Sequence, residues 1–174
     1  ESGFPETYRT AQIDTLNTSK IIKDPLLNEY KKVSTSLLRS YLDGQLKASE
    51  VFDTKLMGTY LGIIEVFGSL HPAIYFNMLF YYNPLTGLLE PIASDASLFQ
   101  RYGKNTIIRN LTEGLFEELL NDEVIFEEYY KTISYLSSEL IEGGNLYKSL
   151  VEIDQDWHSN LVQEYWLLEK INFE

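Results

Sequence analysis

Near the middle of the chain, two segments rich in aromatic and branched residues flank a short loop of turn-forming residues. The loop spans residues 83–87, with the sequence Asn-Pro-Leu-Thr-Gly, and Asn, Pro and Gly each favour a reversal of the chain. The segment before the loop includes residues 74–82, and the segment after it includes residues 88–92. This arrangement predicts a β-hairpin at about 74–93, and Pro91 places part of its second strand at a sheet edge.

On both sides of this hairpin, apolar residues recur at three- and four-residue spacing, which is typical of helices. Asp24 is a good N-cap, Pro25 suits a first helical turn, and Gly44 is expected to end that helix. A second helix is predicted to begin near Asp53 and to end at Gly68. It is apolar on nearly every side, so we expect it to be the buried central helix.

Gly58 and Gly62 lie on one face of this central helix, where we expect them to allow another element to pack closely. Residues 104–140 continue the helical pattern after the hairpin, and the tail is expected to hold further helices. The sequence therefore predicts an extended lead-in over residues 1–24. A single domain is expected over 25–174, in the mainly α (α+β) class, with one central β-hairpin.

Composition limits the classes of partner. Hydrophobic residues make up 44% of the 174-residue chain, which is enough for the core of one domain or one lobe. No apolar run is long enough to span a membrane. The net charge of -12 disfavours nucleic acids and anionic membrane surfaces, which leaves a protein partner or protein substrate as the expectation. The chain has no Cys, which excludes disulfides, thiol catalysis and Cys-based zinc sites.

Several acidic residues after the hairpin recur at helical spacing with no basic residue among them. They are Glu113, Glu117, Glu118, Asp122, Glu123, Glu127 and Glu128. Such a run is typical of a solvated helix face, and the alternative is a docking surface for a basic partner or Ca²⁺. The chain begins with Glu1 rather than Met, so we expect it to start within a longer protein or after processing.

The geometry of the predicted hairpin indicates one candidate site. Asn77 precedes the turn by about as many residues as Asp95 follows it, so antiparallel pairing would place the two roughly opposite each other. Opposed side chains start about 5 Å apart at Cβ, and an amide oxygen and a carboxylate at that spacing could share Mg²⁺. The alternative is that both are turn and capping residues.

Residues 67–95 have the sequence FGSLHPAIYFNMLFYYNPLTGLLEPIASD. This segment resembles the core signature of kinases related to spore coat protein H (CotH-type kinases). That signature has a buried helix, an Asn, a strand with Tyr, an Asn/Asp-Pro-x-Thr-Gly turn, a strand with Pro-Ile and a final Asp. The resemblance is strong over residues 50–97 and implies a fold like the C-terminal lobe of a protein kinase.

The resemblance implies a role for each matching position. Asn77 and Asp95 correspond to the pair that holds the metal of Mg²⁺·ATP. The catalytic Asp of the family should lie five residues before Asn77, where this chain has Pro72, and the second Asp of the family falls on Ser97. Proline offers no group to accept a proton. His71 is the neighbouring candidate for a catalytic base, although a lone His in a loop is more often structural.

Kinases of this fold cover ATP with a strand-rich lobe that carries a Lys and a Gly-rich loop. Residues 1–52 contain no Gly-rich loop, and Lys20 and Lys23 are only loose candidates for the nucleotide-binding Lys. The covering lobe is therefore expected upstream of the chain or not at all. We expect this chain alone to bind ATP poorly.

Three functional hypotheses remain open from the sequence. The first is a catalytically degenerate CotH-like domain, a pseudokinase or scaffold, which the resemblance assigns to the cell envelope or exterior. The second is an active phosphotransferase in which Asn77 and Asp95 hold Mg²⁺·ATP, His71 is the base, and residues outside the chain complete the site. The third is a protein-interaction domain in which the hairpin is only structural.

Overall fold

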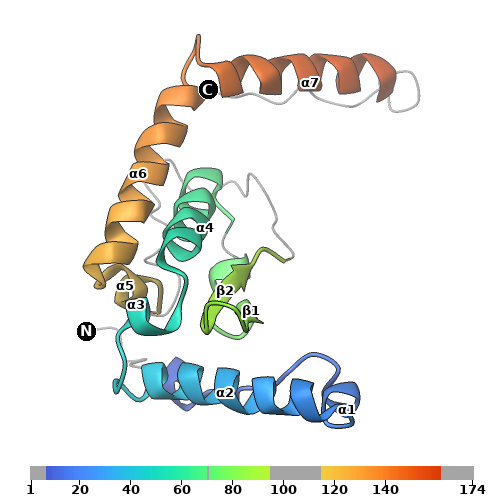
Figure 1. Cartoon of the computed structure of the whole chain (residues 1–174). Coiled ribbons are helices and arrows are strands. Elements are labelled where there is room, and N and C mark those ends of the chain that lie inside the picture. Colours follow the sequence, from blue (N-terminus) through green and yellow to red (C-terminus); the bar gives the residue numbers. More distant parts are fainter. Residues whose placement is uncertain (1–6, 70, 95–114, 162–174) are drawn as a thin grey trace. The chain divides into compact units, whose positions relative to one another are not determined.

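The structure is a computed structural model that describes residues 7–69, 71–94 and 115–161 (Figure 1). It is mostly helical with one two-stranded antiparallel hairpin, which confirms the predicted fold class. The helices are α1 (Thr18–Ile21), α2 (Pro25–Leu42), α3 (Ala48–Val51), α4 (Thr54–Phe67), α5 (Leu115–Leu120), α6 (Glu123–Leu140) and α7 (Asn145–Leu161), with 3₁₀ turns η1 (Thr7–Thr10) and η2 (His71–Ala73); the strands are β1 (Leu79–Asn83) and β2 (Leu88–Ile92).

The chain divides into two compact units, a larger one over Glu1–Ile133 and a smaller one over Ser134–Glu174, with the boundary inside α6. In the smaller unit, Gly143 has a φ of 95° between α6 and α7. There the Asn145 N–H donates to the Glu139 carboxylate at 3.1 Å. No helix in the described part of the chain is long and apolar enough to cross a membrane.

The two main helices of the larger unit begin and end where the sequence predicts. The Asp24 carboxylate accepts hydrogen bonds from the first amides of α2, and the Asp53 carboxylate accepts one from Leu56 N at 2.9 Å. Gly68 ends α4 in the left-handed conformation, with a φ of 62°. The Ser69 N–H then donates to the Ile64 carbonyl at 3.0 Å, which turns the chain away from the helix axis.

The apolar core of the larger unit is built around α4. Met57 and Leu61 of this helix are fully buried, and Leu89 brings the hairpin into the same core. The other buried members of the cluster come from α4 itself, from α2, α3, η2, α5 and α6, and from the α3–α4 junction: Tyr41, Leu42, Ala48, Val51, Phe52, Tyr60, Ile64, Ala73, Leu115, Phe116, Leu119, Ile125 and Tyr129. The central position predicted for α4 is therefore confirmed.

Gly58 and Gly62 form the face of α4 that α6 approaches. A Cβ on Gly58 would lie 2.7 Å from the Ile125 carbonyl oxygen and 2.7 Å from the Tyr129 nitrogen, and a Cβ on Gly62 would lie 2.8 Å from the Thr132 side chain. These separations are shorter than van der Waals contact. The predicted close packing is therefore confirmed, and the partner element is the first half of α6.

The hairpin is fixed by its turn. The Asn83 side chain accepts a hydrogen bond from Leu85 N at 2.9 Å and donates one to Glu90 at 2.7 Å. Gly87 closes the turn with a φ of 74°, a conformation that Gly adopts without strain. In the resulting register, Leu79 lies opposite Ile92 and Phe80 lies opposite Pro91. β2 also bridges to Phe52 on its other side.

The hairpin is shorter than predicted at its first strand. The sequence predicts strand from about residue 74, whereas β1 begins at Leu79. Residues 71–77 form η2 and the following turns, in which the Asn77 N–H donates to the Ile74 carbonyl at 2.8 Å. The aromatic and branched side chains of this segment gave it a strand-like composition, but its backbone hydrogen bonds are local.

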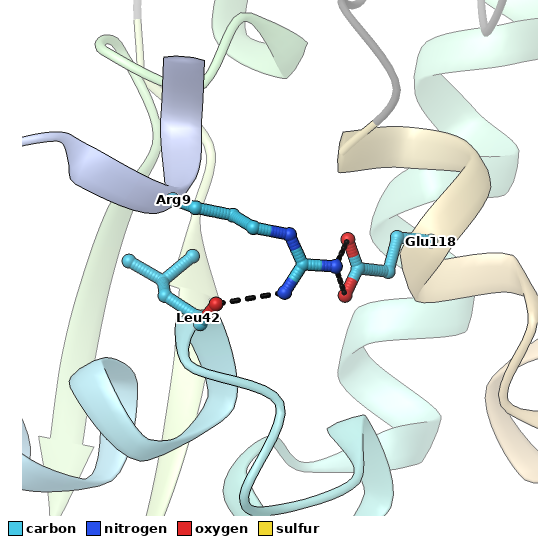
Figure 2. Close-up of polar contacts among 3 residues, drawn as sticks. All are labelled: Arg9, Leu42 and Glu118. Carbon is cyan, nitrogen blue, oxygen red and sulfur yellow. Dashed lines mark hydrogen bonds and ion pairs between the residues drawn. The ribbon is translucent and has the colours of Figure 1, made fainter. Parts of the chain in front are cut away.

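The lead-in contains η1 and α1, where the sequence predicts an extended segment, and two arginines hold it. The guanidinium of Arg39 in α2 donates to the carbonyls of Arg9 and Ala11, both at 2.8 Å. The guanidinium of Arg9 donates to the Leu42 carbonyl at 2.8 Å and to both carboxylate oxygens of Glu118 at 3.0 and 3.1 Å (Figure 2). The lead-in is thereby fixed to the end of α2 and to α5.

Asp122 joins two further helix starts. One carboxylate oxygen accepts from Ser49 N at the start of α3, at 2.8 Å, and the other accepts from Val124 N at the start of α6, at 3.1 Å. Partial burial opposes ionisation, but these hydrogen bonds, with those from the Ser49 side chain and Ile125 N, give a net lowering of the Asp122 pKa. The carboxylate therefore supports the fold in its ionised form.

We predict that Gly58→Ala lowers the free energy of unfolding by about 1–3 kcal/mol, because the new methyl group meets the backbone of α6. Urea unfolding followed by circular dichroism measures the change. Lys55→Ala, on the exposed side of the same helix, is the matched control and should change it by less than about 0.5 kcal/mol. Equal stability of Gly58→Ala and wild type would contradict the close packing of α4 on α6.

We predict that Asp122→Asn lowers the free energy of unfolding by about 1–2 kcal/mol at pH 7. Because the folded-state pKa is lowered, the ionised carboxylate stabilises the fold above the unfolded-state pKa of about 3.9, and this stabilisation is lost as the pH falls through the folded-state value. The difference between variant and wild type should therefore shrink below about pH 4. Urea unfolding at several pH values tests this, with Glu123→Gln as the exposed control.

Candidate functional site

The segment between α4 and β1 carries two of the predicted site residues, His71 and Asn77. The Asn77 amide nitrogen lies 3.2 Å from Nε2 of the His71 ring and 3.2 Å from the His71 carbonyl oxygen. One side-chain amide thus closes the turn from η2 to β1. Asn77 precedes the first strand instead of lying on it, and both side chains are half-buried.

The orientation of the Asn77 amide decides which of its atoms is free to bind a ligand. Its nitrogen faces His71, and within the described part of the chain its oxygen accepts no hydrogen bond. An amide oxygen is a ligand that Mg²⁺ accepts. The side chain is therefore held in a way that fits the metal role inferred from the resemblance.

Pro72 occupies the position where the resemblance places a catalytic Asp. Its ring is buried in η2, and its carbonyl oxygen accepts a hydrogen bond from the Tyr60 hydroxyl at 2.7 Å. Burial raises the pKa of Tyr60 to about 12, so the hydroxyl keeps its proton and donates at any ordinary pH. Tyr60 thus fixes the backbone beside His71, and no side chain at position 72 can accept a proton.

The other half of the predicted metal pair, Asp95, lies outside the described residues, as does Ser97. The described part of β2 ends at Ile92, followed by Ala93 and Ser94. Among the described residues, no group of three or more His, Cys, Asp and Glu side chains is arranged to hold a metal ion. The pairing of Asn77 with Asp95 remains a prediction.

Glu113 of the acidic run lies outside the described residues, and four of the other members have intramolecular partners. Glu118 binds Arg9 (Figure 2), and Lys131 lies 2.9 Å from Glu127 and 2.8 Å from Glu128. Asp122 accepts backbone hydrogen bonds, as described above. Of these residues, Asp122 and Glu118 join separate elements of the fold, whereas the pairs with Lys131 are exposed and lie within one helix.

Two roles were not foreseen from the sequence. Arg9 and Glu118 are 109 residues apart, and no local pattern predicts their contact. In the sequence, Tyr60 is one of many apolar residues of α4. Its hydroxyl donates to the Pro72 carbonyl, and a contact with a backbone atom cannot be recognised from the sequence. Comparison of the chain with protein-family models, curated proteins and solved structures gave no match.

We predict that Tyr60→Phe lowers the free energy of unfolding by about 1–2 kcal/mol, because the Pro72 carbonyl loses its buried donor. Thermal and urea unfolding measure the loss. Tyr130→Phe, whose ring is 63% exposed, is the matched control and should leave stability unchanged. A Tyr60→Phe variant as stable as wild type would show that the hydroxyl does not hold this turn.

Proposed function

We propose that the chain is a CotH-like, kinase-fold domain that has lost phosphotransfer and acts as a pseudokinase or scaffold for a protein partner at the cell envelope or exterior. The observation that carries the proposal is Pro72. It stands five residues before Asn77, where the resemblance requires an acid, and the Tyr60 hydroxyl holds its backbone. Without a carboxylate there, the hydroxyl of an acceptor substrate has no general base at that position.

The proposed compartment and the proposed class of partner rest on other observations than Pro72. The cell envelope or exterior comes from the resemblance alone. A protein partner is supported by the net charge of -12, which disfavours the polyanionic alternatives. Exposed tyrosines such as Tyr81, at 52%, and Tyr135, at 65%, are side chains of the kind that protein interfaces favour.

A second candidate function is an active, atypical phosphotransferase, completed by residues outside the chain. The observation that favours it is the contact between His71 and Asn77, with ring and amide nitrogens 3.2 Å apart. In this alternative, the oxygens of Asn77 and Asp95 would hold Mg²⁺·ATP, and the imidazole beside them would accept the proton. The chemistry that the bound nucleotide supplies is transfer of its terminal phosphoryl group.

Calorimetric titration of the chain with Mg²⁺·ATP is the first test. We expect no measurable heat of binding, because residues 1–52 contain no Gly-rich loop to cover the phosphates. An active protein kinase titrated in the same buffer is the positive control. If heat is observed, Asp95→Ala and Asn77→Ala should each abolish it, and binding that survives both variants would remove the metal role.

Incorporation of labelled phosphate into a generic protein substrate separates the two candidates. The pseudokinase proposal expects no incorporation by the wild type. Incorporation that His71→Ala abolishes, while His158→Ala does not, would overturn the proposal in favour of the active enzyme. A protein partner bound equally by wild type and Asp95→Ala, with no ATP binding, would favour an interaction domain in which the hairpin is only structural.

A further inference from the structure

One edge of β1 is unpaired within the part of the chain that the structure describes. There, β1 pairs with β2 alone, whereas β2 also bridges to Phe52 on its far side, so β1 is the outer strand. On that far side the Leu89 carbonyl accepts from Asp53 N. Leu89 and its partner Tyr82 therefore form the kind of antiparallel pair in which the backbone polar groups of both residues point away from the other strand.

The register gives Phe80 the same orientation as Tyr82. Phe80 lies two residues before Tyr82 and opposite Pro91, which has no N–H to donate to β1. The N–H and C=O groups of Phe80 and Tyr82 thus point outward from the hairpin. None of them makes a hydrogen bond to another described residue. This edge therefore presents a row of backbone donors and acceptors at the spacing of a β-ladder.

The sequence of this edge does not protect it from pairing. Natural edge strands are often blocked by a charged side chain, a proline or a bulge. β1 has the sequence Leu-Phe-Tyr-Tyr-Asn, with no charge and no proline, and its register with β2 is continuous. The Tyr81 side chain is 52% exposed. An edge of this kind is a template on which another extended chain can pair.

A cavity of about 930 Å³ lies beside this edge, between α2 and the hairpin. Its lining includes residues 79–82 of β1, and successive strand side chains point to opposite faces of a sheet. Because β2 occupies the other edge, a cavity that touches all these positions reaches the unpaired edge. The α2 side of the cavity carries Leu27, Tyr30 and Leu38. Apolar space therefore adjoins the unpaired backbone groups, a combination that suits a polypeptide strand better than a ligand without a backbone.

Charge distinguishes a partner protein from a second copy of the chain. The described lining carries one carboxylate, Asp14, and one ammonium, Lys31, so it has no excess charge and suits an uncharged stretch of polypeptide. The chain as a whole has a net charge of -12, which opposes the approach of a second copy. The same charge attracts a partner with basic residues on either side of the uncharged stretch.

We propose that β1 is a docking edge for an extended segment of a partner protein, which adds a third strand to the hairpin in the space beside α2. The backbone of the segment pairs with Phe80 and Tyr82, its alternate apolar side chains occupy the cavity, and basic residues flank it. The inference specifies how a partner binds, and it rests on the proposed function as a scaffold for a protein partner.

The first test is selection of a phage-displayed library of random short peptides on the immobilised chain. We expect the enriched peptides to have alternating apolar residues over the length of β1 and Lys or Arg at their ends. The most enriched peptide is then synthesised, and fluorescence polarisation measures its affinity for the chain.

N-methylation of this peptide, one residue at a time, tests the strand pairing. In an added strand, alternate N–H groups point at β1. Methylation should therefore weaken binding by about tenfold at every second residue and leave it unchanged at the residues between. This test needs no variant of the chain, so it does not depend on whether a variant folds.

Tyr82→Pro removes one outward N–H from the chain and leaves the bonds between β1 and β2 intact. Tyr82→Val is the matched control, because it loses the same ring but keeps the N–H. We expect Tyr82→Pro to bind the peptide about tenfold more weakly than Tyr82→Val. Circular dichroism and thermal unfolding check that both variants are folded.

Three outcomes would overturn the proposal. The first is a library from which no peptide is enriched. The second is N-methylation that weakens binding at helical spacing or equally at every residue, which would assign the cavity to a helix or to contacts with side chains alone. The third is loss of peptide binding as the chain dimerises in analytical ultracentrifugation, which would assign the edge to a second copy.

Failure of the docking edge and failure of the proposed function give different results. None of these three outcomes involves phosphotransfer, so each would remove the docking edge and leave the proposed loss of phosphotransfer in place. Incorporation of labelled phosphate that depends on His71 would remove the pseudokinase proposal, whether or not a peptide binds to β1.

Discussion

The close approach of α4 and α6 at Gly58 and Gly62 is the contact on which the larger unit depends. With no side chains in the way, the backbone of α6 comes within van der Waals distance of α4, and Ile125 and Tyr129 become buried. The N-terminal end of the same central helix also contacts the hairpin. At its start, Asp53 N donates to the Leu89 carbonyl at 2.9 Å. The position of α4 thus determines the position of β2.

The far end of α4 determines the geometry of the candidate site. Gly68 reverses the chain into η2, and Tyr60, from the middle of the helix, fixes the Pro72 carbonyl. The turn that follows is closed by the Asn77 amide against His71. The half of the candidate site formed by His71 and Asn77 is therefore an extension of the helix terminus, and its pairing with Asp95 remains a prediction.

Features encoded by a few neighbouring residues were predictable from the sequence. Asp24, Asp53 and Gly68 mark helix ends, because each forms hydrogen bonds with backbone groups within one helical turn. The sequence Asn-Pro-Leu-Thr-Gly likewise forms its turn through contacts among its own residues. The start of β1 was predicted too early because Ile74, Tyr75 and Phe76 have the composition of a strand. Their amides and carbonyls are instead used in local turns, and composition cannot distinguish these two cases. The arginine contacts of the lead-in join residues far apart in the sequence, which leaves no periodic signal.

The ion pair between Arg9 and Glu118 also has a consequence for how the chain folds during its synthesis. The two residues are separated by 109 positions, so Arg9 leaves the ribosome long before its partner does. At ordinary elongation rates the delay is roughly 5 to 20 s, far longer than helix formation or hairpin closure. During that interval the lead-in can already be held by Arg39 of α2, and only its contact with α5 is missing. Formation of the Arg9–Glu118 ion pair is therefore a late step, which closes the loop between these two residues.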